Sequence, residues 1–335
     1  MTGADETTAR ADHGPARPPL VIVGPTATGK SALALALARR HAGVEIVSAD
    51  AMAVYRGMRI GTAAPTAAEA AEVPHHVVGV VAPSEEYGVA RFQADAEAAL
   101  AAIEQGGGTP VMVGGTGLYV RAVVDGFTLP GRYPATRAEV EAEPSTGTLW
   151  RRLAELDPEA AEKTTVTNRR RIVRALEVTV GSGRPFSSYG PGVDHYPDTR
   201  FRLIGLRLPR PDLDRRIADR YLRQVDEGFL DEVAALDRRS WSRTAARALG
   251  YAELGAYLDG ETDLEQALAE ATVRTRRFAR RQERWFRRDP RIVWFEADRA
   301  DLVDAVDRWW SDPAQDPHPP LPAPARRWPD FPGAG

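Results

Sequence analysis

Short apolar runs alternate with helical patterns over the first third of this chain. Largely apolar runs at 20–23, 45–48 and 110–113 predict buried strands. Between them, apolar residues spaced three and four apart predict helices over 31–41 and 91–105. Because strands alternate with helices, the pattern predicts an α/β fold with a doubly wound parallel sheet.

The pattern changes after Gly126. From Gly126 to about Gly147 it breaks into turn residues and an acidic stretch, and we expect a small, reduced helical insertion over 126–165. Helical patterns dominate the rest, with one strand expected to rejoin the sheet and another near the end. The predicted helices are 148–156, 168–180, 210–237, 244–258 and 264–288, and the predicted strands are 201–208 and 291–295.

The expected organisation is an α/β core in two parts with added helices. The core spans 19–125 and is completed by 166–310, on either side of the insertion. Residues 1–18 are small and polar, and 311–335 are dense in proline, so both ends are expected to be disordered tails.

Composition excludes several classes of protein. Hydrophobic residues make up 43% and charged residues 27% of the 335 residues, which is ordinary globular usage and excludes collagen or a coiled coil as the whole-chain structure. The absence of cysteine excludes disulfides, thiolate metal sites and a cysteine nucleophile. No apolar run reaches the ~18 residues of a membrane span, and the acidic N-terminal residues contain no signal-peptide core. We therefore expect a cytoplasmic protein without a membrane partner, acting as a monomer.

The positive charge is concentrated in two places, although the net charge is −3. Between Arg274 and Arg288 the sequence has eight arginines and one acidic residue. Helical spacing brings four of the arginines near one another: Arg277, Arg281, Arg284 and Arg288. Phe278, Trp285 and Phe286 are expected on the other side, as anchors to the core. A second cluster holds Lys163, Arg169, Arg170, Arg171, Arg174 and Arg184. These clusters favour a nucleic-acid partner over a merely solvated helix face, which is the alternative in so arginine-rich a chain.

A phosphate-binding loop lies between the first predicted strand and helix. Its sequence matches the pattern G-x-x-x-x-G-K-[ST] in the strand and helix context that the pattern requires. Glycines let backbone N–H groups surround a phosphate, the lysine supplies a compact charge, and the serine hydroxyl can hold Mg²⁺. The alternative is a glycine-rich turn without a ligand. The loop consists of Gly24, Pro25, Thr26, Ala27, Thr28, Gly29, Lys30 and Ser31.

Two further features follow the other predicted strands. Asp50 ends the second strand, and the Gly-rich turn at 114–117 follows the third. Ligands of open parallel sheets bind at the carboxyl ends of the strands, so both features are expected beside the phosphate loop. Asp50 could also start a turn, cap a helix or bind magnesium.

In this order, the motifs resemble those of one family, the tRNA dimethylallyltransferases, also called tRNA isopentenyltransferases. The resemblance runs from about Val21 to Arg288. Besides the phosphate loop, it rests on Glu-Ile-Val-Ser-Ala-Asp at 45–50, Val-Tyr-Arg-Gly-Met at 54–58, Ile-Gly-Thr-Ala at 60–63, Pro-His-His at 74–76, Gly-Gly-Thr-Gly-Leu-Tyr at 114–119, Arg-Ala-Leu-Glu-Val at 174–178, Leu-Gly-Tyr at 249–251, and an Arg-rich segment with Gln282, Trp285, Phe286 and Arg287.

The resemblance implies transfer of a dimethylallyl group from dimethylallyl diphosphate to N6 of the adenine beside the anticodon, position 37 of tRNA. It implies that the loop binds this diphosphate instead of ATP, and Ser31 of the loop motif would hold Mg²⁺ there. Asp50 would be the general base, Thr26 would contact the diphosphate, and Arg220 would grip the leaving group. Positions that match tRNA-contacting ones are Asp50, Ala51, Met52, Ala53, Thr116, Arg137, Arg170, Arg171, Ile172, Val173 and Arg174, to which the helical stripe adds Arg277 and Arg281.

The sequence departs from the family pattern near the site. Ala51 and Ala53 stand where the family commonly has Ser and often Gln, and Ala64 replaces the usual Lys, which affects the expected contacts to adenine. Two other functions fit parts of the sequence. A small-molecule kinase would use ATP on the same loop, and a non-catalytic RNA-binding module would carry the loop as a relic.

Overall fold

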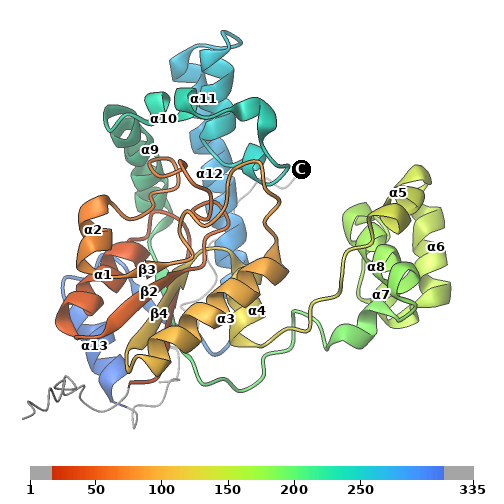
Figure 1. Cartoon of the computed structure of the whole chain (residues 1–335), viewed down its shortest axis with the longest axis horizontal. Coiled ribbons are helices and arrows are strands. Elements are labelled where there is room, and N and C mark those ends of the chain that lie inside the picture. The colour runs from red at the N-terminus through yellow and green to blue at the C-terminus, as the bar shows by residue number, and fades with distance from the viewer. Residues whose placement is uncertain (1–16, 313–335) are drawn as a thin grey trace, which may run out of the picture. The chain divides into compact units, whose positions relative to one another are not determined.

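The computed structural model describes residues 17–312 and consists of two compact units (Figure 1). Unit 2 is Asp125–Pro197, and unit 1 contains the described residues on either side of it. Within residues 17–312, no helix is both long and apolar enough to cross a membrane.

Unit 1 is built on a six-stranded, entirely parallel sheet, as the alternating pattern predicts. The order of the strands is β3-β2-β4-β1-β5-β6, so the strand after unit 2 returns beside β1. The strands are β1 (Leu20–Val23), β2 (Val44–Ser48), β3 (His75–His76), β4 (Thr109–Gly114), β5 (Arg202–Arg207) and β6 (Val293–Glu296).

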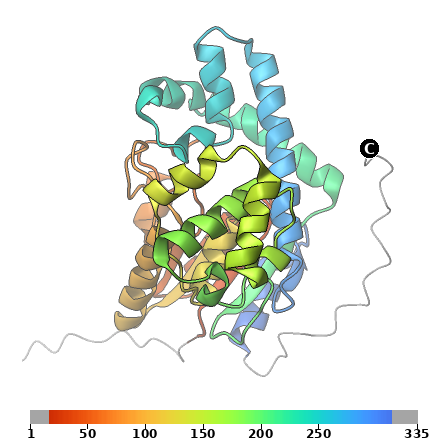
Figure 2. The ribbon, with the colours of Figure 1, turned by 90° about the vertical axis from the view of Figure 1, so that its right-hand side faces the viewer.

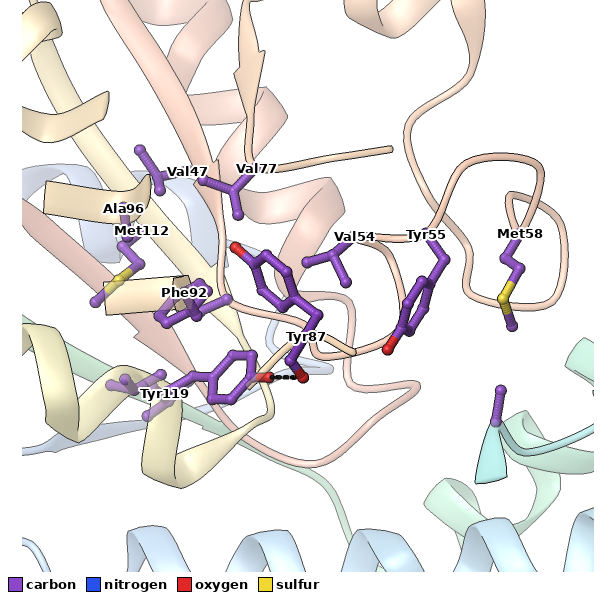
Figure 3. Packing of buried hydrophobic residues seen from close by; sticks show 14 of the residues in the cluster. Val47, Val54, Tyr55, Met58, Val77, Tyr87, Phe92, Ala96, Met112 and Tyr119 are labelled. Atoms are coloured by element: carbon purple, nitrogen blue, oxygen red, sulfur yellow. Dashed lines mark hydrogen bonds between the residues drawn. The ribbon is translucent and has the colours of Figure 1, made fainter. Parts of the chain in front are cut away.

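Helices cover both faces of this sheet. Leu20 and Ile22 of β1 face α1 and α13, whereas Val21 and Val23 face the cluster formed with α3 and α4, because successive strand side chains point to opposite faces. Figure 3 shows part of that second cluster, where Phe92 stacks on Tyr119 with the ring centroids 4.3 Å apart. These helices are α1 (Lys30–Arg40), α3 (Val89–Gln105), α4 (Gly117–Val124) and α13 (Leu302–Ser311).

The remaining helices of unit 1 lie beyond the carboxyl ends of the strands, apart from the short α2 (Ala67–Glu72) beside the sheet (Figure 1). The expected helix over 210–237 is two helices, since Gly228, with φ of +94°, turns the chain between them. The expected helix over 244–258 begins at Tyr251, after a 3₁₀ turn. The elements are α9 (Arg210–Asp226), α10 (Phe229–Ala235), α11 (Tyr251–Leu258) and α12 (Leu264–Phe286), with 3₁₀ turns η2 (Arg238–Ser240) and η3 (Ala245–Arg247). Figure 2 shows α11 and α12 as a packed pair.

Unit 2 is larger than the insertion expected over 126–165. It extends to Pro197 because α8 supplies Ile172, Val173 and Leu176 to the same apolar cluster as Leu149 and Leu153 of α6. The sequence pattern assigned α8 to the core because its helical period resembles that of the helices that follow. The elements are α5 (Pro134–Ala142), α6 (Thr146–Leu156), α7 (Pro158–Glu162), α8 (Arg169–Ser182) and η1 (Phe186–Tyr189).

The predicted tails lie outside the described residues, except at 17–18 and 311–312. These short stretches contact each other, since the Arg17 guanidinium donates to the Ser311 hydroxyl over 3.3 Å. The indole Nε1 of Trp310 donates to the carbonyl of Pro18 over 2.8 Å, and the Trp310 ring is buried. The contacts of unit 1 therefore extend slightly beyond 19–310 at both ends.

Candidate active site

The phosphate-binding loop joins β1 to α1, as predicted. Gly24 has a φ of +139°, and a Cβ there would lie 2.5 Å from the carbonyl oxygen of Leu206 on the neighbouring strand, so glycine is required. Gly29, with φ of +90°, opens α1. The buried Thr28 hydroxyl donates to the Pro25 carbonyl over 2.8 Å, so this side chain shapes the loop and does not face a ligand.

Two cavities flank Asp50. One, of about 530 Å³, is lined by phosphate-loop residues including Lys30 and Ser31, and by Gly114 and Gly115 of the second Gly-rich turn. The other, of about 620 Å³, is lined by Ala51, Met52, Thr116, Arg277 and Arg281, all expected to contact RNA. Six residues line both cavities: Thr26, Ala27, Asp50, Thr62, Arg220 and Phe278. Three of them, Thr26, Asp50 and Arg220, are the residues expected to take part in catalysis.

Asp50 both holds a turn and presents a free oxygen. Its Oδ1 accepts the backbone N–H groups of Met52 at 2.8 Å and Ala53 at 3.3 Å, so the turn-starting interpretation of this residue is correct. Among the residues described, its Oδ2 has no hydrogen-bond partner, and Asp50 lines both cavities. One carboxylate can therefore fix the backbone and accept a proton.

Arg220 reaches the phosphate loop from α9. Its guanidinium donates to the Thr26 hydroxyl over 3.0 Å and to the Gly61 carbonyl over 3.0 Å. Burial lowers the pKa of Arg220, but an arginine side chain keeps its proton at neutral pH. A fixed positive charge thus stands beside the loop that would hold the diphosphate.

The pKa of the Lys30 ammonium is lower than that of a lysine in solution. Its ammonium donates to the Pro25 carbonyl over 2.7 Å. Burial lowers the pKa of Lys30 to about 8, an effect that the charge of Asp50 opposes and that of Arg220 reinforces. The free protein therefore loses the Lys30 proton just above neutral pH.

This pKa predicts a pH dependence of diphosphate binding. The ammonium form binds the anion, so above pH 8 binding must take up a proton, and the Kd for dimethylallyl diphosphate should rise about tenfold per pH unit. Below pH 8, Lys30 should add no slope. Calorimetric titration from pH 7 to 9.5 measures this. Lys30→Arg is the control, because its guanidinium stays charged and its Kd should lose this rise. A wild-type Kd that stays flat would contradict the prediction.

Gln282 is a site residue to which the sequence analysis assigned no role. Its buried amide accepts the N–H of Thr26 over 2.9 Å and donates to the carbonyl of Gly115 over 2.9 Å. A Cβ on Gly115 would lie 2.1 Å from the Gln282 Nε2. Gln282 therefore joins the two glycine-rich turns. The sequence feature that could have indicated this role is a single amide side chain on the face of an arginine-rich helix that is buried.

Comparison with known proteins identifies the family. A profile of the IPP transferase family matches residues 53–289, and a profile described as isopentenyl transferase matches residues 20–75. A tRNA dimethylallyltransferase of Thermobifida fusca is 48% identical, over 85% of this chain and 92% of its own length. The chain belongs to this tRNA dimethylallyltransferase family. Other bacterial members are similarly close, such as that of Streptomyces coelicolor, 47% identical over 87% of this chain and 94% of its own.

A solved structure of the family has the same fold. The tRNA isopentenylpyrophosphate transferase of Bacillus halodurans superposes with a TM-score of 0.64 at 36% identity, covering 88% of this chain and 96% of its own. The order of motifs along the sequence thus identified the family correctly.

Helix α12 presents the predicted arginine stripe. Arg277, Arg281 and Arg284 of α12 and Arg288, just after the helix ends, are all exposed, and Arg277 and Arg281 line the cavity that contains Thr116. Phe286 is buried as expected, and the Trp285 ring packs directly over Gly117. The expectation for Phe278 is wrong. This ring lines both cavities, with the Arg281 guanidinium 5.7 Å from its centroid, because residues three apart on a helix lie on the same face.

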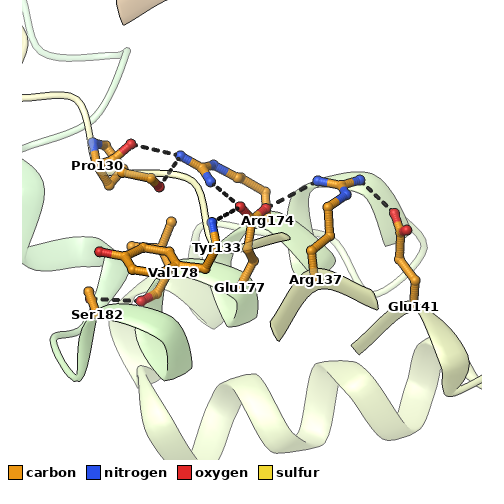
Figure 4. Close-up of polar contacts among 9 residues, drawn as sticks. Pro130, Tyr133, Arg137, Glu141, Arg174, Glu177, Val178 and Ser182 are labelled. Atoms are coloured by element: carbon orange, nitrogen blue, oxygen red, sulfur yellow. Dashed lines mark hydrogen bonds and ion pairs between the residues drawn. The ribbon is translucent and has the colours of Figure 1, made fainter. Parts of the chain in front are cut away.

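Arg137 and Arg174 of unit 2 share a buried carboxylate (Figure 4). The Glu177 side chain pairs with Arg137 at 3.2 Å and with Arg174 at 2.7 Å, and also accepts the N–H of Tyr133. A buried carboxylate is stable only when paired, so part of the role of both arginines is structural.

The segment 170–174 divides between surface and core. Arg170 and Arg171 are exposed in the first turn of α8 and suit a phosphate contact. Ile172 and Val173 are buried in the apolar core of unit 2, with exposed fractions of 0% and 2%. Their side chains are therefore not available to tRNA, because the helical period turns them away from solvent.

Proposed function

We propose that the protein transfers the dimethylallyl group of dimethylallyl diphosphate to N6 of adenine 37, next to the tRNA anticodon, and releases diphosphate. The observation that carries this proposal is the position of Asp50, Thr26 and Arg220. They line both the cavity of the phosphate loop and the cavity bordered by exposed arginines. Donor and acceptor substrates entering from the two sides would meet at these residues.

Asp50 is suited to accept the proton in this reaction. The N6 amine is a poor nucleophile, so its proton must leave as nitrogen attacks C1 of the dimethylallyl group. The N6–C1 bond forms, the bond from C1 to the diphosphate oxygen breaks, and Oδ2 of Asp50 takes the proton. Oδ1 stays bound to the turn at Met52, which keeps the carboxylate in place.

The leaving diphosphate would be stabilised by fixed positive groups. Lys30, Arg220 and the loop N–H groups would be in position before the reaction begins. They would therefore not have to move as negative charge develops on the leaving oxygen. Mg²⁺ suits this site because it binds through few protein oxygens together with phosphates, and the exposed Ser31 hydroxyl lines the cavity. The ion would neutralise charge on the diphosphate. That the protein is a cytoplasmic monomer stays a prediction.

The acceptor base would enter from the basic cavity. A base in the anticodon loop must leave its stack to reach the half-buried carboxylate of Asp50, and phosphate contacts on either side hold the backbone while it does so. Arg277 and Arg281 of α12 and Thr116 border this entrance. The Thr116 hydroxyl accepts the N–H of Ala51 over 3.1 Å, so its own role includes fixing the Asp50 turn.

Replacing both Arg277 and Arg281 with glutamine should weaken tRNA binding and flatten its salt dependence. Each lost phosphate contact reduces the log–log slope by about 0.7 for single-stranded RNA, so the pair should remove roughly 1.4. Affinity for dimethylallyl diphosphate should stay nearly unchanged. Arg299→Gln with Arg308→Gln, at two exposed positions just before and within α13, is the matched control. An unaltered slope in the α12 variant would show that the stripe does not face RNA.

The overall proposal is tested by the tRNA nucleosides of the cell. Mass spectrometry of tRNA from cells that lack the gene should show loss of isopentenyladenosine and its derivatives. The purified protein should restore the modification when given dimethylallyl diphosphate. Unchanged nucleosides would overturn the proposal, and turnover of ATP to ADP would favour the kinase alternative.

A further inference from the structure

A single carboxylate outside the cavities binds four donors. Glu232, on α10, accepts the N–H groups of Arg59 at 2.9 Å and Ile60 at 2.8 Å through Oε2. Its Oε1 accepts the N–H of Gly61 at 3.2 Å and the hydroxyl of Tyr251 at 2.6 Å. Three consecutive backbone donors converging on one side chain fix the path of the segment 59–61.

Neighbouring side chains hold the same segment from other directions. A Cβ on Gly61 would lie 2.3 Å from the Phe229 ring and 2.4 Å from the Tyr251 ring, so this backbone lies directly on two aromatic side chains. The amide of Gln224 donates to the carbonyls of Ile60 and Gly61. The segment therefore has one well-defined position, set by α9, α10 and α11.

The fixed segment in turn orients Arg220. The Gly61 carbonyl accepts one guanidinium N–H over 3.0 Å, while the other end of the guanidinium donates to Thr26. A continuous set of contacts thus leads from Glu232, through Gly61 and Arg220, to the phosphate loop. Glu232 lines neither of the two cavities described, so it would touch no substrate.

We propose that Glu232 is a positioning residue for the transfer reaction: by holding residues 59–61, it sets the orientation in which Arg220 meets the leaving diphosphate. The proposal rests on the proposed function of Arg220 as the group that stabilises the diphosphate. The contacts that α10 and α11 make with residues 59–61 would then serve the reaction as well as folding.

The negative charge of Glu232 is essential to this role. Burial and the bond to Glu232 raise the pKa of Tyr251, so its hydroxyl remains a donor over the working range. All four groups around Glu232 are then donors, and an amide can offer only one oxygen to them. In Glu232→Gln, at least one N–H of the segment loses its acceptor, and the Gly61 carbonyl should shift away from Arg220.

A double-mutant cycle separates positioning from stability. Glu232→Gln should lower the single-turnover rate about ten- to hundredfold with saturating substrates, because a displacement of about 1 Å in a positioned group can cost that much. In the Arg220→Ala background, the same change should lower the rate by less than about twofold, since the residue it positions is absent. tRNA affinity should be unchanged in both backgrounds.

Two other outcomes would contradict the positioning role of Glu232. A wild-type rate in Glu232→Gln, or an equal fold-loss in both backgrounds, would overturn the proposal, because a purely structural defect does not depend on Arg220. If Glu232→Gln fails to fold, Tyr251→Phe removes only one donor and should lower the rate about fivefold with the same dependence on Arg220. Asp231→Asn, an exposed neighbour on α10, is the matched control and should have no effect.

The same experiment distinguishes failure of the underlying function. If the wild-type protein transfers no dimethylallyl group to tRNA, the proposed function fails. If it does transfer the group and Arg220→Ala is fully active, the function stands and the positioning role of Glu232 falls.

Discussion

Replacing Asp50 with asparagine should lower the rate of dimethylallyl transfer by about 10²- to 10⁴-fold, the range of general-base catalysis. The substitution removes the proton acceptor and little else. An asparagine Oδ1 can still accept the N–H groups of Met52 and Ala53, so the turn should persist. The measurement is a single-turnover rate with saturating tRNA and prenyl donor, which isolates the chemical step.

The fold and the affinity for dimethylallyl diphosphate serve as controls for Asp50→Asn. Thermal unfolding and the Kd for dimethylallyl diphosphate should stay near the wild-type values, because the phosphate loop is untouched. Asp226→Asn, at an exposed position on α9, should leave the rate unchanged. A loss of less than about tenfold in Asp50→Asn would mean that another group accepts the proton.

Truncating Arg220 to alanine should lower kcat/KM for dimethylallyl diphosphate by about 10²- to 10³-fold, as expected when one fixed donor to a developing anion is removed. The guanidinium is held by Thr26 and Gly61 before substrate arrives, so its loss removes a preorganised charge. Lys30→Ala should act in the same direction, since it removes a second positive group from the same cavity.

A comparison along α9 checks that this effect is local. Arg215→Ala removes an exposed guanidinium that pairs with Asp212 at 2.8 Å, and it should leave kcat/KM unchanged. ATP should compete poorly with dimethylallyl diphosphate in the wild-type protein. If Arg220→Ala loses no more activity than Arg215→Ala, the leaving group is stabilised by other residues.

Most of the sheet and part of the site could be predicted from the sequence because their signals are local. The phosphate loop, Asp50 and the turn at 114–117 each follow an apolar strand, and parallel strands bring their carboxyl ends to one edge. The two-residue strand at His75–His76 and the short helices were missed, since elements of this length carry little periodicity.

The sequence by itself determined the family, the phosphate loop and the exposed stripe of α12, because each motif behind them consists of residues near one another in the chain. Tertiary structure decided how distant residues complete the site, including Arg220, whose role the family resemblance had already implied. Arg220 lies 194 residues from Thr26, Gln282 lies 256 from it, and Glu232 lies 171 from Gly61. It also placed Ile172 and Val173 in a core and extended unit 2 to Pro197. The physical reason is that hydrophobic periodicity shows which face of an element is buried but not which partner buries it.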